Sequence, residues 1–172
     1  MPHKYYNAIS VFYKSQYFAV QKAWERFHSW PKAWQILKKD INVDPDKEWE
    51  RLEKRKIKLM MPTDKDFPEM IKEIPSPPFG LYVRGNLEPA LSAIAIVGTR
   101  KATQEGQKIS RQFGRELAEQ GIVVVSGLAL GIDQAAHKGA LEAKGKTVAV
   151  LANGLDLIYP RQHENLANQI IE

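Results

Sequence analysis

Three segments of the chain place a glycine turn directly after a short apolar run. They share this pattern at residues 94–101, 122–131 and 147–154. The first segment ends in Gly98-Thr99-Arg100-Lys101, which adds a hydroxyl and two cations to the turn. Glycine lets a backbone approach a ligand closely, and a guanidinium can fork onto phosphate oxygens. The pattern therefore predicts a phosphate-binding edge.

Helical patterns between these segments indicate how the turns are positioned. Residues 103–120 predict one helix, residues 131–144 a second, and Tyr159-Pro160 introduces a third. In the first helix Ile109, Phe113 and Leu117 recur every four residues, which predicts an inward face. Strands that alternate with helices predict a parallel sheet whose three glycine turns share one edge.

The first sixty residues differ in kind, because their pattern is helical throughout. Trp24, Phe27 and Trp34 are candidates for a buried stripe, and Trp30 lies beside Pro31 at a helix break. A proline-rich connector follows at residues 62–78. We therefore predict an α/β fold in which a Rossmann-like parallel sheet follows a small helical N-terminal region, with domains at 1–60 and 61–172.

Charge is distributed unevenly along the 172 residues. Residues 1–60 hold 13 Lys/Arg against 7 Asp/Glu, whereas residues 61–172 hold 12 against 13. The basic excess thus lies outside the glycine-rich region. The cluster Lys54-Arg55-Lys56 is typical of a solvated face, and contact with nucleic acid is its alternative interpretation.

Several kinds of chemistry are excluded by the residues present. The chain has no cysteine, and its four histidines show no metal-ligand spacing. Ser126 does not lie in a nucleophile elbow, because Val124 occupies the position of the first glycine. Neither a dinucleotide fingerprint nor a P-loop is present. We therefore predict no catalytic residues, no metal and no cofactor.

Asp133 and His137 lie one helical turn apart and allow two interpretations. They could pair or share a metal, but no third ligand is evident. Alternatively, Asp133 stabilises the first turn of its helix and braces the turn that shapes the ligand edge. The chain also shows no signal pattern and no apolar stretch long enough to span a bilayer, so we expect a cytoplasmic protein without membrane contact.

Several ordered motifs resemble one protein family. Residues 95–103, 125–137 and 145–156, with Tyr159-Pro160, closely resemble the DNA-processing protein A family (DprA, also called Smf). Asp66-Phe67-Pro68 and residues 77–87 resemble its entry segment, with Phe67 where tyrosine is more usual. The resemblance covers about residues 62–172.

This resemblance implies an extended Rossmann fold that binds single-stranded DNA. It also implies protection of incoming strands in natural transformation, loading of the recombinase RecA, and no catalytic activity. Arg100 would be the principal phosphate ligand, and Lys101, Lys146 and the Gly154 turn would be weaker ones. The DNA-phosphate-binding residues implied by the resemblance are Gly98, Thr99, Arg100, Lys101, Ser126, Gly127, Gly131, Lys146 and Gly154.

The family fold continues past the third strand, so we expect an incomplete Rossmann-like domain here. Family dimerisation and much of the RecA contact are attributed to that further half. Two alternatives to DNA binding remain. One is a nucleoside-phosphate-binding enzyme such as a nucleotide N-glycoside hydrolase, whose Pro-Gly-Gly-x-Gly-Thr loop is absent from this sequence. The other is a chain without binding function.

Overall fold

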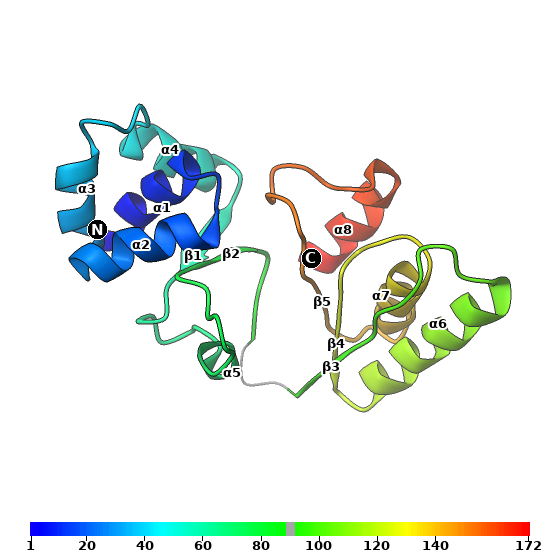
Figure 1. The fold of residues 1–172 in the computed structure, drawn as a ribbon. Helices are drawn as coiled ribbons and strands as arrows, with labels where there is room; N and C mark the ends of the chain where they lie inside the picture. The colour runs from blue at the N-terminus through cyan, green and yellow to red at the C-terminus, as the bar shows by residue number, and fades with distance from the viewer. Residues whose placement is uncertain (89–91) are drawn as a thin grey trace. The chain divides into compact units, whose positions relative to one another are not determined.

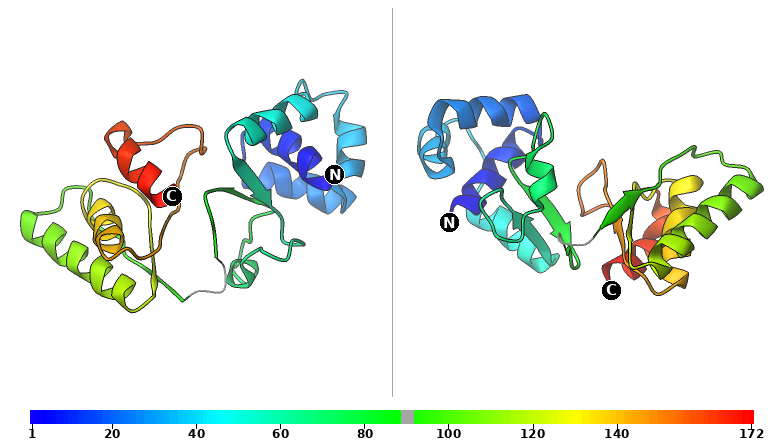
Figure 2. Two further views of the ribbon diagram at one scale, coloured as in Figure 1. Left: turned by 180° about the vertical axis from the view of Figure 1, so that it is seen from behind. Right: turned by 90° about the horizontal axis from the view of Figure 1, so that it is seen from below.

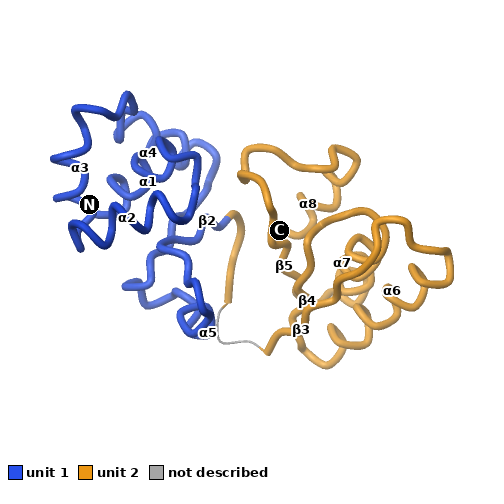
Figure 3. The backbone as a smooth tube through the Cα atoms, in the orientation of Figure 1, with its two compact units in different colours: residues 1–83 blue, residues 84–172 orange. Residues whose placement is uncertain are grey.

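The computed structural model describes residues 1–88 and 92–172 and divides into two compact units, 1–83 and 84–172 (Figure 3). The first unit contains α1 (Pro2–Phe12), α2 (Tyr17–Phe27), α3 (Trp30–Leu37), α4 (Pro45–Lys54), β1 (Ile57–Met60) and α5 (Glu69–Lys72), with β2 (Leu81–Arg84) at the boundary. The second contains β3 (Ala93–Ala95), α6 (Gln104–Glu119), β4 (Val123–Ser126), α7 (Ile132–Glu142), β5 (Thr147–Ala149), the 3-10 turn η1 (Arg161–His163) and α8 (Glu164–Ile171) (Figure 1).

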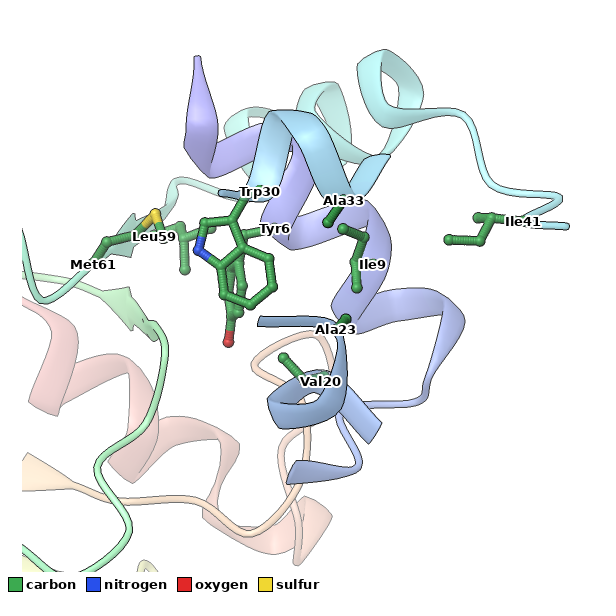
Figure 4. Packing of buried hydrophobic residues seen from close by; sticks show 9 residues of the cluster. All are labelled: Tyr6, Ile9, Val20, Ala23, Trp30, Ala33, Ile41, Leu59 and Met61. Carbon is green, nitrogen blue, oxygen red and sulfur yellow. The ribbon is translucent and has the colours of Figure 1, made fainter. Parts of the chain in front are cut away.

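The core of the first unit is built around Trp30, which is only 3% exposed. Its ring lies 5.0 Å from that of Tyr6 in an edge-to-face contact (Figure 4). The Trp24 ring lies 4.9 Å from that of Trp30. The predicted stripe of Trp24, Phe27 and Trp34 is only partly buried around this core. Trp30 takes the central position because it begins α3, which packs across α1.

Residues after 60 complete the first unit. Strand β1 pairs with β2. The Phe79 ring lies 5.6 Å from that of Trp30, and a Cβ on Gly80 would come within 2.7 Å of the Tyr6 ring. The compact unit therefore ends at Val83, later than the predicted boundary at residue 60, because this segment packs on the helices that precede it.

The second unit is a parallel sheet in the order β3-β4-β5, which confirms the Rossmann-like prediction. Ala95 pairs with Val125, and Val125 with Val148. Side chains alternate across a strand, so Val124, Thr147 and Ala149 share one face. Val124 packs against α6 and α7, and Ala149 against α8. All three helices therefore cover the same face of the sheet.

The opposite face of the sheet is open at its carboxyl end. Val97 is 74% exposed and Val150 is 62% exposed, and Ala95 is exposed on the edge strand β3. Parallel sheets are normally covered on both faces. At this end of the strands, the described residues of the second unit thus cover only one face of the sheet.

Helices α6 and α7 pack through small residues, side by side in both views of Figure 2. A Cβ on Gly114 would lie 2.3 Å from the Ala136 carbonyl oxygen. The buried stripe of α6 is Ser110, Gly114 and Ala118. The predicted inward face was therefore wrong for Ile109 and Phe113, which are exposed, because close backbone approach requires small residues at the contact.

The side chain of His137, a residue of α7, is buried against the sheet. The Thr147 hydroxyl donates its proton to the Val124 carbonyl oxygen, so it accepts from the His137 Nδ1–H at 2.7 Å. The Nε2 atom of His137 is left without a hydrogen-bond partner among the described residues. Burial lowers the pKa of His137 to about 4, with a smaller opposing effect from Asp133.

Replacing Gly139 with alanine is expected to destabilise the second unit. The added Cβ would lie 1.9 Å from the Arg111 carbonyl oxygen, which forces the two helices apart at a cost of about 2 kcal/mol. All four tryptophans lie in the first unit, so the loss should appear in backbone hydrogen exchange of α6 and α7 and leave tryptophan fluorescence unchanged. Gly106→Ala is the control, because its nearest atom would be 3.3 Å away. Equal exchange rates in both variants would contradict the close-packing argument.

Acid should destabilise the second unit through His137. Above about pH 6.5 the imidazole is neutral in both the native and the unfolded chain. Between about pH 6.5 and pH 4 the unfolded chain takes up a proton that the native chain refuses, so stability falls by about 3 kcal/mol in total. His137→Asn keeps a donor for Thr147 but cannot titrate. Urea denaturation followed by circular dichroism should show a flatter pH dependence in this variant, and an equal slope would rule out His137 as the cause.

Candidate nucleic-acid interface

The three glycine turns lie at one edge of the sheet, as predicted. Gly98 follows β3, Gly127 follows β4 and Gly154 follows β5. Because the strands are parallel, their carboxyl ends meet at the same edge (Figure 1). This is the edge at which open α/β sheets bind ligands.

A buried carboxylate joins two of these turns. Asp133 lies in the first turn of α7 and is 6% exposed. Its Oδ2 accepts from the Gly127 N–H at 3.0 Å and more weakly from the Ala129 N–H at 3.5 Å. Its Oδ1 accepts from the Gly98 N–H at 3.4 Å. The prediction that Asp133 braces the turn is thereby confirmed.

The glycines permit this close approach. A Cβ on Gly98 would lie 2.6 Å from the Ile132 side chain, and a Cβ on Gly127 would lie 2.8 Å from Asp133 Oδ2. Gly131 has a φ of +81° and lies against the main chain of Thr99, whose oxygen would be 2.3 Å from an added Cβ. The Ile132 N–H then donates to that same Thr99 oxygen at 3.3 Å. The Gly98–Lys101 loop is thus seated on the beginning of α7.

Two hydrogen-bond donors that the family resemblance implied for a ligand are engaged within the protein. The Ser126 hydroxyl donates to the Ile96 carbonyl oxygen at 2.6 Å, and its side chain is buried. The Gly127 N–H is held by Asp133. Gly131 is buried as well. Ser126, Gly127 and Gly131 therefore form the scaffold beneath the turn.

The open part of the site lies on the Gly98–Lys101 loop. Arg100 and Lys101 are exposed, and within the described residues the Arg100 guanidinium has no ion pair. The Thr99 Oγ1 accepts from the Lys101 N–H at 3.1 Å, so the hydroxyl proton stays available for an acceptor. Two cations and a hydroxyl on a braced loop can bind a phosphate.

Lys146 and Gly154 lie in different places relative to this loop. Lys146 directly precedes β5, which puts it at the amino end of the strands, and its ammonium pairs with Glu88. The structure therefore does not bring Lys146 to the glycine edge. Gly154 is exposed in the loop after β5, where the Asn153 side-chain amide donates to its oxygen at 2.9 Å.

The described titratable side chains near this edge form no metal-binding group. Over residues 1–88 and 92–172, no group of three His, Asp or Glu side chains is placed to hold a metal. Asp133 and His137 bond to separate partners, the glycine turns and Thr147. In the same described part of the chain, no helix is long and apolar enough to cross a membrane.

Sequence reasoning missed one support of the loop. The Ser110 hydroxyl on α6 donates to the Ile132 carbonyl oxygen at 2.8 Å, which ties α6 to the beginning of α7. Thr103 caps α6 by accepting from the Gly106 N–H at 3.1 Å. The Thr103 cap could be found from the sequence, because threonine is a preferred residue at the start of a helix. The Ser110 contact depends on tertiary packing and has no such signal.

Known proteins are similar to this chain in sequence. The family described as DNA recombination-mediator protein A matches residues 58–172. A Smf protein of Synechocystis sp. is 40% identical over 140 residues, covering 78% of this chain and 35% of that protein. The DNA processing protein DprA of Bacillus subtilis is 37% identical over 110 residues, covering 63% of this chain and 37% of that protein. The chain thus spans little more than a third of these relatives.

Two solved structures are similar as well. The X-ray structure of DprA from Streptococcus pneumoniae superposes with a TM-score of 0.64 and 36% identity, covering 74% of this chain and 48% of that one. A DprA structure from Helicobacter pylori, described for its single-stranded DNA binding mode, gives a TM-score of 0.59 and 30% identity, covering 67% and 52%. The strand–glycine–helix order, the braced edge and these matches agree: the chain belongs to the DNA recombination-mediator protein A (DprA/Smf) family.

Proposed function

We propose that this chain binds single-stranded DNA at the carboxyl edge of its parallel sheet. The observation that carries the proposal is the exposed Arg100 guanidinium, held on a loop whose main chain is fixed by Asp133 and α7. Such a loop presents a cation without having to order itself on binding, which favours affinity. The single-stranded DNA binding of the Helicobacter pylori relative supports this ligand class.

The residues of the edge divide into two roles. Arg100, Lys101 and Thr99 contact backbone phosphates, while Gly154 borders the site from the loop after β5. Ser126, Gly127 and Gly131 position that loop through their internal bonds. Phosphate contacts carry no base information, so binding is independent of sequence.

We propose that the chain acts by binding and not by catalysis. The relatives and structures described above are DNA-processing proteins. In the described residues the Ser126 hydroxyl bonds to the main chain and His137 bonds to Thr147, so the two do not form a nucleophile–base pair. The nucleotide N-glycoside hydrolase alternative gains no support from these observations.

We also propose for this chain the protection of incoming DNA and the partnership with RecA that the family resemblance implies. Protection of incoming strands during natural transformation follows from DNA binding at the edge. RecA loading and homodimer formation are further proposals, made from the family resemblance alone. Pull-down of RecA with the chain, with and without single-stranded DNA, would test that partnership.

Arg100→Ala should weaken single-strand binding by about 2 kcal/mol, equally for different base sequences, because a charge-assisted phosphate contact is lost. The log–log salt slope should flatten by about 0.7, the value for one phosphate of a single strand. Arg100→Lys should recover part of the affinity, because an ammonium lacks the planar fork. Fluorescence anisotropy with labelled oligonucleotides at several salt concentrations measures both quantities.

Lys54→Ala is the control for this measurement. Lys54 is exposed on α4 and already lies 3.6 Å from the Glu50 carboxylate. Its removal should change the affinity less than removal of Arg100. A larger loss with Lys54→Ala would show that the helical region, and not the glycine edge, is the main DNA surface.

Asp133→Asn should weaken DNA binding although residue 133 is buried beneath the loop. The asparagine keeps the size of the side chain, but its amide group would face a backbone N–H that needs an acceptor, at a cost of about 1–3 kcal/mol. Hydrogen exchange at Gly98 and Gly127 should accelerate together with the loss of affinity. Glu105→Gln, on the exposed first turn of α6, supplies the matched control. Undiminished binding with rapid exchange at both glycines would show that the brace is not needed for the site.

A further inference from the structure

The first three helices carry an uncompensated positive charge. Residues 1–39 hold seven Lys/Arg and one acidic residue, Glu25. Among the described residues only Lys4 of these seven has a carboxylate partner, Asp46 at 2.6 Å. The six others are exposed: Lys14, Lys22, Arg26, Lys32, Lys38 and Lys39. Lys22, Arg26 and Lys32 lie on α2 and α3, and the other three lie in the segments that follow α1 and α3. By contrast, Arg51 and Lys54 of α4 pair with acidic residues of the same helix.

A hollow of about 210 Å³ lies within this basic region. Ala19 and Ala23 of α2, together with Leu37 of α3, provide apolar lining. Lys22 and Arg26 also line it, and they lie one turn apart on α2, so they project from the same face. The hollow therefore combines an apolar floor with a pair of cations at its border.

Two aromatic rings complete the lining. Tyr13 follows the end of α1, and Phe27 ends α2. The Arg26 guanidinium already lies 5.1 Å from the centre of the Phe27 ring. Phe12, beside Tyr13 with ring centres 5.0 Å apart, is 38% exposed. Aromatic rings interleaved with cations are the combination that binds single-stranded nucleic acid, with bases stacked on rings and phosphates on the cations.

We propose that this α1–α3 surface is a second site for single-stranded DNA, centred on Lys22, Arg26 and Tyr13. The proposal rests on the proposed function for its ligand class, but it uses residues of the other compact unit. A single strand that is long enough to reach both sites meets the second site at a high effective concentration once it is bound at the first. A long oligonucleotide should therefore bind more tightly than a short one. The gain in affinity should exceed the gain expected from the larger number of phosphates alone.

The test compares the full chain with a Lys22→Gln/Arg26→Gln double variant. The matched control, Arg51→Gln/Lys54→Gln, removes the same charge from exposed positions on α4. Oligothymidines of about 6 and about 30 nucleotides distinguish one site from two, because a site takes roughly 4–16 nucleotides. Anisotropy gives affinities, and tryptophan fluorescence reports on the first unit alone, since it holds all four tryptophans.

The Lys22→Gln/Arg26→Gln double variant, called the α1–α3 variant below, should bind the long strand about tenfold more weakly at low salt. Its log–log salt slope should be flatter by about 1.4, because two phosphate contacts are lost. Its affinity for the short strand should change by less than about twofold, because the short strand can still bind at the Arg100 edge through its phosphates. Quenching of tryptophan fluorescence by the long strand should disappear. An equal loss in the α4 control, or an equal loss for both strand lengths, would overturn the proposal.

Three further outcomes distinguish a second DNA site from the alternatives. If polyglutamate of equal charge displaces the strand as well as unlabelled oligothymidine does, the surface recognises acidic protein and the proposal is overturned. Arg100→Ala tests the proposed function independently. A loss with Arg100→Ala but none with the α1–α3 variant leaves the glycine edge as the site and overturns the second one. Retained tryptophan quenching in Arg100→Ala supports the second site.

Discussion

The hydrogen bonds of the Asp133 carboxylate are the interaction on which the candidate DNA edge depends. One buried side chain accepts from the turn after β3 and from the turn after β4, so the two turns keep a fixed relation. A buried carboxylate needs such donors, because an unpaired charge is costly away from water. The bonds therefore stabilise the charge and hold the Arg100 loop at once. The cations themselves stay exposed and free to meet phosphate.

Small residues make that arrangement possible. Gly98 and Gly131 let the loop reach the beginning of α7, and Gly114 and Gly139 let α6 and α7 approach closely. The Ser110 hydroxyl then bonds the Ile132 carbonyl oxygen across the helix pair. A wider helix separation would lengthen this bond and lift α7 away from the loop. Close packing between the helices and the geometry of the site are thus parts of one structure.

Much of this organisation could be predicted from the order of residue types. Strand–glycine–helix units, the three helices of the second unit and the shared edge of Gly98, Gly127 and Gly154 are all observed. The helical interpretation of residues 1–60 holds through α4, and β1 begins at Ile57. These predictions succeed because periodicity and glycine placement are local properties. The predicted inward face of α6 failed because apolar spacing alone does not show that a helix contact needs small side chains, as at Gly114.

The sequence by itself determined the strand and helix pattern, the glycine turns and the family to which the chain belongs. The tertiary structure decided which groups of the edge stay open to a ligand. Ser126 and Gly127 look like ligand donors in the sequence, but Ile96 and Asp133 occupy them. Lys146 lies at the amino end of its strand, away from Arg100. The physical reason is that a hydrogen-bond donor can serve the fold or a ligand, and only the positions of its neighbours in space show which.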